Sequence, residues 1–259
     1  MTRALARIAL VVAALALPFS ARGAEEVVQL AVRPGAQMAV VLMPKPGAIG
    51  TAILLSGGDG GTSWSREGKP TSNNFLVRSR ALFHDEGFHV VVPFRASDKR
   101  TMDNAYRTTA EHLDELAQVV ALARARFGGP VWLVGTSRGS VSAAYAARKL
   151  PPGTLDGVAM TSSVAWRVPG NVASQALDEI KVPALVVHHA MDACDFCPPK
   201  GAQWIYDGLT SAPARKLIMI AGGSEPTGDA CGPTHWHGYI NFEAETVHLM
   251  ADWMKRPPQ

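Results

Sequence analysis

The chemistry that the sequence offers centres on a serine at a predicted strand-to-helix turn. An apolar run ends in Gly135-Thr136-Ser137-Arg138-Gly139, and an alanine-rich, helix-favouring segment follows over 141–150. This pattern predicts a strand, a tight turn with Ser137 at its tip, and a helix. The glycines two residues before and after the serine let the strand and the helix approach each other without a Cβ clash. A serine beside a helix N-terminus is typical of a nucleophile, and the alternative is an ordinary loop serine.

A serine hydroxyl needs an imidazole to take its proton and a carboxylate to orient that imidazole. Both follow Ser137 in the order serine, acid, histidine. Asp192 lies just past a predicted strand, and His237 lies in the loop after the next one. Two alternatives remain open, because Asp195 is three residues from Asp192 and His235 is two residues before His237.

A serine nucleophile also needs donors for the oxyanion that forms in acyl transfer. The backbone N–H of Arg138, the residue after the serine, is one expected donor. The second is expected from the glycine-rich loop Ser56-Gly-Gly-Asp-Gly-Gly61, at Gly58 or, failing that, at Asp59. The alternative is a plain glycine-rich surface turn. A phosphate loop is disfavoured because no Gly-Lys-Ser/Thr follows.

The elements that must position these residues alternate between short apolar runs and helical patterns. Strands are predicted at Ala39–Pro44, Gly50–Leu55, Phe88–Pro93, Pro130–Val134, Asp156–Met160, Ala184–Val187 and Leu217–Ile220. Helices are predicted at Phe75–Glu86, 109–127, 141–150 and Asn241–Trp253. Strands separated by helices predict a mostly parallel sheet, whose ligand site lies beyond the carboxyl ends of the strands. Each of the motifs above follows such an end.

Together, these motifs resemble the α/β-hydrolase superfamily, and more narrowly its compact, exported, dienelactone-hydrolase-like members. The resemblance covers about residues 40–255 and rests on Ser56-Gly-Gly-Asp-Gly60, on Gly-Thr-Ser137-Arg-Gly, on His188-His-Ala-Met-Asp192 and on His237-Gly-Tyr. It implies an α/β fold with a mostly parallel central sheet flanked by helices. About twenty residues separate the strands near Thr161 and Pro183, which leaves no room for a large cap domain.

The resemblance also implies a serine hydrolase that cleaves a carboxylic ester through Ser137, Asp192 and His237, with a small-molecule substrate and no cofactor. It places the catalytic imidazole directly before Gly-aromatic, which matches His237 rather than His235. A binding protein that kept the fold without activity is the alternative from another class.

Six further predictions concern two histidines and four tryptophans. His188 and His189 end a strand and are expected to be structural. Trp166 and Trp236 are expected to line the pocket, whereas Trp132 and Trp253 are expected in the core.

The first 23 residues are predicted to be a secretory signal peptide, and residues 24–259 a single domain. Arg3 and Arg7 precede an apolar run, Ile8–Leu17, that is too short to span a bilayer, and Gly23 ends a small-residue cleavage site. We therefore expect a periplasmic or secreted protein. Removing residues 1–23 lowers the count of Lys and Arg from 25 to 22, equal to the 22 Asp and Glu. This neutral charge argues against nucleic-acid or membrane partners.

The three cysteines fall in the two loops assigned to Asp192 and His237. If these loops converge at the active site, Cys194 and Cys231 come close, and in an oxidising compartment they are expected to form a disulfide. Pairing of Cys197 with Cys231 is the rival. Cys194-x-x-Cys197 also has zinc-like spacing. No tight second pair follows, so no metal is expected, and a metal-dependent hydrolase remains an alternative.

Overall fold

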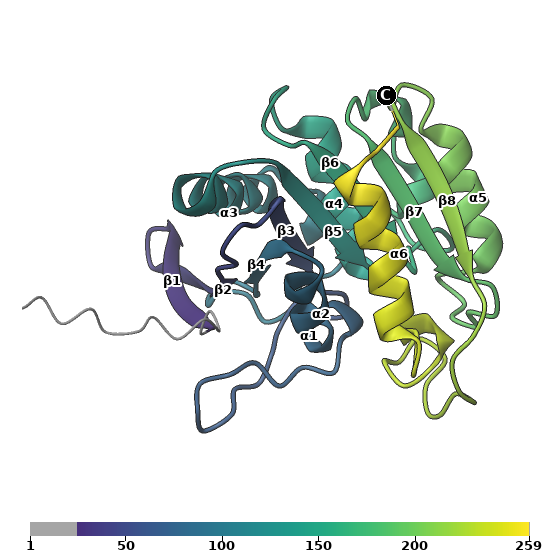
Figure 1. The fold of residues 1–259 in the computed structure, drawn as a ribbon, viewed down its shortest axis with the longest axis horizontal. Coiled ribbons are helices and arrows are strands. Elements are labelled where there is room, and N and C mark those ends of the chain that lie inside the picture. Colours follow the sequence, from purple (N-terminus) through teal and green to yellow (C-terminus); the bar gives the residue numbers. More distant parts are fainter. Residues whose placement is uncertain (1–24, 259) are drawn as a thin grey trace, which may run out of the picture.

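The computed structural model describes residues 25–258, so the predicted signal peptide at 1–23 lies outside the described residues. One eight-stranded sheet runs through the molecule in the order β1-β2-β4-β3-β5-β6-β7-β8 (Figure 1). The strands are β1 Glu26–Arg33, β2 Ala36–Met43, β3 Gly50–Leu55, β4 Phe88–Pro93, β5 Val131–Thr136, β6 Gly157–Thr161, β7 Ala184–His189 and β8 Arg215–Ile220. The helices are α1 Phe75–Arg78, α2 Arg80–Asp85, α3 Ala110–Phe127, α4 Arg138–Lys149, α5 Pro199–Gly208 and α6 Glu243–Lys255.

The sheet is mostly parallel, as predicted. Only β1 and β2 at one edge run antiparallel to their neighbours, and β4, β3, β5, β6, β7 and β8 are parallel to one another. The carboxyl ends of the parallel strands therefore meet at one edge of the sheet, which is where a ligand site is expected.

Helices cover both faces of the sheet. Helices α3, α4 and α5 pack on one face, while α1, α2 and α6 pack on the other, where α6 crosses the sheet (Figure 1). Each face of the sheet has its own hydrophobic core, and β5 contributes side chains to both because side chains alternate along a strand. Leu133 joins the first core, and Trp132 joins the second, where it packs edge-on against Trp253 at 5.7 Å. The core positions predicted for these two tryptophans are correct.

Several predicted boundaries are wrong. The strand predicted at Ala39–Pro44 is Ala36–Met43, and β1 was not predicted because half of its side chains are exposed. The single helix predicted at Phe75–Glu86 is broken at Ser79 into α1 and α2. Helix α5 was missed, and the closing helix is Glu243–Lys255.

The segment between β6 and β7 has no cap domain, as predicted. It holds two short 3-10 helices, Val172–Ser174 and Leu177–Glu179. This leaves the carboxyl edge of the sheet accessible. Within the described part of the chain, no helix combines the length and the apolarity that a membrane crossing requires.

Candidate active site

Ser137 occupies the tip of the turn between β5 and α4. Its φ of 52° is left-handed, and its backbone N–H donates to the Thr161 carbonyl oxygen at 3.0 Å. A Cβ on Gly139 would overlap the Leu55 carbonyl oxygen, so only glycine lets α4 start this close to β3. The close packing at this turn explains why glycines lie two residues before and two residues after Ser137.

Asp192 and His237 meet in a buried hydrogen-bonded pair beyond β7 and β8. His237 Nδ1 lies 2.8 Å from Asp192 Oδ2, and both residues are 5% exposed. The second oxygen, Asp192 Oδ1, accepts from the Cys194 backbone N–H at 2.9 Å, which fixes the carboxylate. His237 Nε2 is buried without a hydrogen-bond partner among the described residues, and His237 lines the same cavity as Ser137. The arrangement leaves this nitrogen available for a proton from the serine side of the cavity.

The alternatives Asp195 and His235 lie elsewhere. Asp195 is exposed, whereas Asp192 is buried. His235 packs edge-on against Trp236 at 5.3 Å and makes no hydrogen bond to Asp192 in residues 25–258. The structure brings together Ser137, Asp192 and His237 and leaves the two alternatives apart.

His188 contacts the same carboxylate, which the sequence did not predict. Its Nε2 lies 3.3 Å from Asp192 Oδ2 and 2.9 Å from the Cys197 carbonyl oxygen. Burial by itself raises the pKa of Asp192, but hydrogen bonds from His188 and His237 and their charge lower it to about 2. His188 was expected to be a structural histidine; it is buried with Nε2 beside the Cys197 carbonyl oxygen, and it also contacts the carboxylate oxygen that His237 bonds to. His189 is structural, since its Nε2 lies 2.9 Å from the Gly222 carbonyl oxygen.

The depressed pKa of Asp192 predicts a loss of stability in acid. When the pKa of a carboxyl group is lower in the folded than in the unfolded protein, its ionised form stabilises the fold at any pH above the unfolded pKa. This stabilisation is lost as the pH falls from the unfolded pKa to below the folded pKa. Wild type should lose about 2 kcal/mol of this contribution between about pH 5 and pH 2. Urea unfolding across this pH range, with Asp192→Asn and the exposed control Asp195→Asn, measures it. An Asp192→Asn defect that stays constant down to pH 2 would contradict the assignment.

The two predicted oxyanion donors lie on either side of Ser137. Arg138 is the first residue of α4, where backbone N–H groups have no partner within the helix. Across the site, a Cβ on Gly57 would lie 2.8 Å from Ser137 Cβ, so the glycine-rich loop is in contact with the nucleophile. The Gly58 N–H has no backbone partner within residues 25–258, and Gly58 lines both cavities that meet at Ser137. This placement suits an oxyanion hole at Gly58 and Arg138.

Arg107 holds the glycine-rich loop in place through backbone carbonyl groups, and no sequence pattern pointed to this role. The side chain is 1% exposed, and its guanidinium donates to the carbonyl oxygens of Ser56 at 3.1 Å and Gly58 at 3.4 Å. It also donates to the Met102 carbonyl and to Ser142 Oγ. Burial lowers the pKa of Arg107 to about 9, so it stays charged at neutral pH. Arg107 therefore holds the peptide groups on both sides of the Gly58 N–H.

Substitution Arg107→Lys should impair the oxyanion donor without preventing substrate binding. A lysine cannot reproduce the fork that joins both carbonyls. We expect kcat to fall about tenfold with little change in KM, and the affinity for a boronic acid, which mimics the tetrahedral intermediate, to weaken equally. Arg124→Lys, on the opposite edge of the sheet, is the control. A lower melting temperature with unchanged boronate affinity would assign Arg107 a structural role only.

The predicted disulfide between Cys194 and Cys231 is present, and Cys197 is a buried free thiol. The disulfide ties the loop of Asp192 to the loop of His237. Burial and the neighbouring Asp192 raise the pKa of the Cys197 thiol well above its usual range, although its contact with the Ser137 side chain opposes this. Cys197 is therefore protonated and unreactive at neutral pH.

Removing the disulfide should destabilise the folded protein. The bond closes a loop of 37 residues, for which chain entropy gives roughly 3–4 kcal/mol. We expect the double variant Cys194→Ser/Cys231→Ser to lose this amount in urea unfolding. Wild type in reductant should fall to the same value, whereas the double variant should not respond to reductant. Equal stability of oxidised wild type and double variant would contradict the prediction.

The pair Cys194-x-x-Cys197, which has zinc-like spacing, lies beside His237 in the structure. Cys194 Sγ, Cys197 Sγ and a ring nitrogen of His237 lie within 4.8 Å of one another. Cys194 Sγ is bonded to Cys231 and cannot act as a thiolate ligand, so this cluster keeps only Cys197 and His237, fewer than the three protein ligands of a catalytic zinc site. The chemistry of these donors disfavours a metal centre while the disulfide is intact.

Two cavities meet at Ser137, and Ser137, Gly58 and Cys231 line both of them. The first, of about 280 Å³, is named the His237 cavity and is lined by Gly57, Gly58, Asp59, Gly61, Ser72, Asn73, Asn74, Phe75, Thr136, Ser137, Cys231, Pro233, His237 and Gly238. The second, of about 360 Å³, is named the Phe196 cavity and is lined by Gly58, Asn104, Ser137, Arg138, Val164, Val168, Cys194, Phe196, Cys197, Asp229 and Cys231. A substrate bound at Ser137 can therefore extend in two directions.

The tryptophans predicted for the pocket wall line neither cavity. Trp166 is exposed and packs against Trp204 at 5.5 Å, and Trp236 stacks on His189 at 5.9 Å. This prediction is wrong: the apolar lining of the Phe196 cavity comes from Val164, Val168, Phe196 and the Cys194–Cys231 disulfide.

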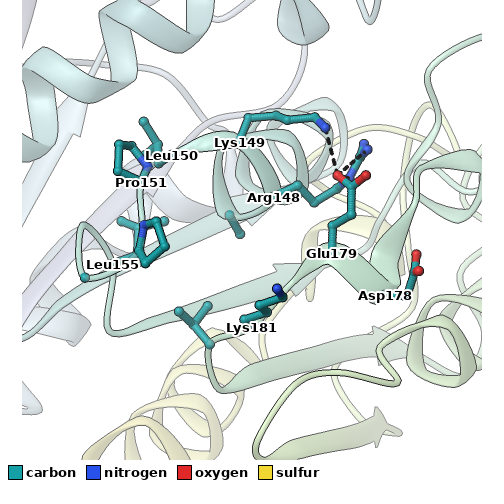
Figure 2. A pocket seen from close by; sticks show the side chains of 12 residues that line it. Arg148, Lys149, Leu150, Pro151, Leu155, Asp178, Glu179 and Lys181 are labelled. Atoms are coloured by element: carbon teal, nitrogen blue, oxygen red, sulfur yellow. Dashed lines mark hydrogen bonds and ion pairs between the residues drawn. The ribbon is translucent and has the colours of Figure 1, made fainter.

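A larger groove of about 610 Å³ lies at the opposite edge of the sheet. It is lined by the end of α4 and by residues that precede β6 and β7, including Leu155 and Val182. Figure 2 shows the side chains of Arg148 and Lys149 directed at Glu179, which both contact. The groove holds no serine, cysteine or histidine, so its size does not make it a competing active site.

Comparison with known proteins shows the fold. No protein-family model matches the chain, and none of the curated proteins compared with it matches either. Solved structures do match. An esterase from Pyrococcus furiosus superposes with a TM-score of 0.64 at 14% identity, over 90% of this chain and 91% of the esterase.

Two further structures agree with this result. A dienelactone hydrolase from Anabaena variabilis matches with a TM-score of 0.63 at 16% identity, over 91% of this chain and 99% of that protein. An α/β serine hydrolase without a lid, from Xanthomonas campestris, matches with a TM-score of 0.58 at 19% identity, over 91% and 96%. The chain has the α/β-hydrolase fold without a lid, as the sequence motifs predicted.

Proposed function

We propose that this chain is a serine hydrolase that cleaves carboxylic esters of small molecules by acyl transfer. The observation that carries the proposal is the buried pair of His237 Nδ1 and Asp192 Oδ2 at 2.8 Å, with His237 Nε2 unpartnered in a cavity that Ser137 also lines. The esterase and hydrolases of the same fold support it by likeness of fold.

The mechanism follows from the roles that these atoms can take. Ser137 Oγ bonds to the ester carbonyl carbon while its proton passes to His237 Nε2. The carbonyl oxygen becomes an oxyanion, which the N–H groups of Gly58 and Arg138 stabilise. The bond to the leaving oxygen then breaks, and that oxygen takes the proton from His237 and departs as an alcohol.

The second half of the reaction repeats these steps with water. Water attacks the acyl-enzyme and gives a proton to His237 Nε2, the bond to Ser137 Oγ breaks, and the serine recovers the proton. The acid is released. Asp192 stays ionised throughout, because its pKa of about 2 lies far below neutral pH, and it stabilises the charged imidazole.

Ester turnover combined with probe labelling tests the proposal. The folded protein should hydrolyse short-chain esters, lose this activity on reaction with a fluorophosphonate, and keep it in the presence of a chelator. Failure to label with specific ligand retention would indicate a binding protein, and loss of activity to the chelator with bound metal would indicate a metal-dependent hydrolase. Either result would overturn the proposal.

We also propose export to the periplasm or the medium. Two observations support it: the charged and apolar pattern of residues 1–23, and the Cys194–Cys231 disulfide, which persists in oxidising compartments. Fractionation of cells that express the full chain tests it.

A further inference from the structure

The two cavities at Ser137 differ in which catalytic groups they contain. His237 lines only the His237 cavity, whereas the Phe196 cavity contains Arg138 and lacks His237. The leaving oxygen takes its proton from His237 Nε2, and such a transfer requires hydrogen-bond reach. The leaving alcohol therefore occupies the His237 cavity, and the acyl group extends into the Phe196 cavity.

The His237 cavity, where the leaving alcohol is placed, is lined by polar side chains that can form further hydrogen bonds. Asn74 Oδ1 accepts from the Leu76 N–H at 3.2 Å, and its Nδ2, which lies beside Gly57, donates to no partner within residues 25–258. Ser72 Oγ accepts from the Asn74 N–H and keeps its own proton to donate. Asn73 is exposed, and its side-chain amide makes no hydrogen bond within residues 25–258.

The carboxylate that lines the His237 cavity belongs to Asp59, and its charge is balanced by an ion pair. Burial raises the pKa of Asp59, but bonds from the Gly61 N–H and from Arg95 lower it below its ordinary value. Its Oδ2 lies 2.6 Å from Arg95 Nη1, so the carboxylate is ionised and paired. A neutral group with several hydroxyls fits such a cavity better than an ion or an alkyl chain, because each hydroxyl both donates and accepts.

The Phe196 cavity is apolar near the nucleophile. Val164 and Cys197 are buried, Val168 is half-buried, and the Cys194–Cys231 disulfide completes the wall. Phe196 is 44% exposed and extends this apolar lining outward. The polar side chains Arg138 and Asp229 are exposed, and Asn104 is set deeper, with its Oδ1 buried and without a hydrogen-bond partner among residues 25–258. Beside Asn104, an aliphatic chain buries the apolar surface of Val164, Val168 and Phe196.

We propose that the substrates are esters of an aliphatic acid with a hydroxylated, uncharged alcohol such as a glycerol or a sugar. This inference rests on the proposed esterase function and adds the identity of the two halves of the ester. The acyl half lies along Val164, Val168 and Phe196, and the alcohol half lies along Ser72, Asn73 and Asn74.

Two pairs of esters of matched size separate the two halves. Glyceryl butanoate and pentyl butanoate differ only in the alcohol, and methyl pentanoate and methyl glycerate differ only in the acid. We expect kcat/KM to favour glyceryl butanoate and methyl pentanoate by about tenfold each, since a methylene or a hydrogen-bonded hydroxyl in a subsite changes kcat/KM by at least about this factor. Preference for the pentyl ester or for the glycerate would overturn the proposal.

Variants assign each preference to its cavity. Asn73→Leu should erase the glyceryl preference and leave the acid preference unchanged. Val168→Phe, and Phe196→Ala as an exposed alternative that spares folding, should weaken the acid preference and leave the alcohol preference unchanged. After the alcohol has left, only the acyl group remains bound. Asn73→Leu should therefore not alter the deacylation rate, measured by single-turnover kinetics, whereas the Phe196-cavity variants should.

The outcomes also separate this inference from the proposed function. Turnover of all four esters with the two effects exchanged, or with no selectivity, overturns the substrate assignment and keeps the esterase. Absence of turnover together with absence of fluorophosphonate labelling overturns both.

Discussion

Replacing Ser137 by alanine is expected to reduce kcat for ester hydrolysis by a factor on the order of 10⁴–10⁶, since removing a serine nucleophile has effects of this size. Its hydroxyl is the group in the site that can form the acyl-enzyme with His237 as base. The fold should survive, because the side chain adds no hydrogen bond that a strand or helix needs and its backbone bond to Thr161 remains. Activity assays and thermal unfolding of the purified variant measure both.

Ser140→Ala is the matched control for this variant. Ser140 lies one turn further along α4, and its Oγ donates to the Ser137 carbonyl oxygen at 2.6 Å instead of facing the cavity. It should retain activity within about tenfold of wild type, the factor that corresponds to one modest hydrogen bond. If Ser137→Ala keeps activity comparable to that of Ser140→Ala, the nucleophile has been misassigned.

Replacing His237 by alanine is expected to be far more damaging than replacing His235. Of these two histidines, His237 bonds to Asp192 and lines the cavity with Ser137, whereas His235 does neither within residues 25–258. Loss of the general base should lower kcat by at least about 10³-fold, whereas His235→Ala should stay within about tenfold of wild type. The two variants replace the same residue type in the same loop, so comparing their kcat values at one pH isolates the catalytic role of the His237 imidazole.

Two results would reverse this assignment. Equal losses in the two histidine variants would indicate that the loop itself, rather than one imidazole, is required. A larger loss in His235→Ala would make His235 the base. Because Asp195 is exposed and Asp192 is buried against His237, Asp192→Asn should likewise exceed Asp195→Asn in its effect on kcat.

The features that the sequence predicted well depend on local patterns. Glycine is required at 139 because a Cβ there would overlap the Leu55 carbonyl oxygen of β3, and at 135 because a Cβ there would overlap the Gly139 carbonyl oxygen of α4. The spacing of the two glycines therefore predicts the turn. Buried strands such as β5 are continuous apolar runs, which made the parallel sheet recognisable. The Cys194–Cys231 disulfide followed from the convergence of two loops at one edge of the sheet.

The features that it missed depend on contacts between distant segments. Arg107 acts through carbonyl groups more than forty residues away, and backbone acceptors leave no trace in residue type. His188 reaches Asp192 because the loop after β7 folds back over the strand end. Strand β1 lies at the sheet edge, where exposed polar side chains weaken its apolar pattern. Trp166 was misplaced because it packs on Trp204 of α5, a helix that was not predicted.

The central claim is that Ser137 is the nucleophile, and mapping the residue that a fluorophosphonate modifies tests it most directly. Trypsin cuts after Arg126 and Arg138, so residues 127–138 form one peptide in which Ser137 is the only serine, and Ser140 falls in the next peptide. We expect the phosphonyl mass on the peptide 127–138 of wild type, and slower labelling of that peptide in His237→Ala. Modification of a different peptide, or ester turnover by a protein that carries no adduct, would contradict the account.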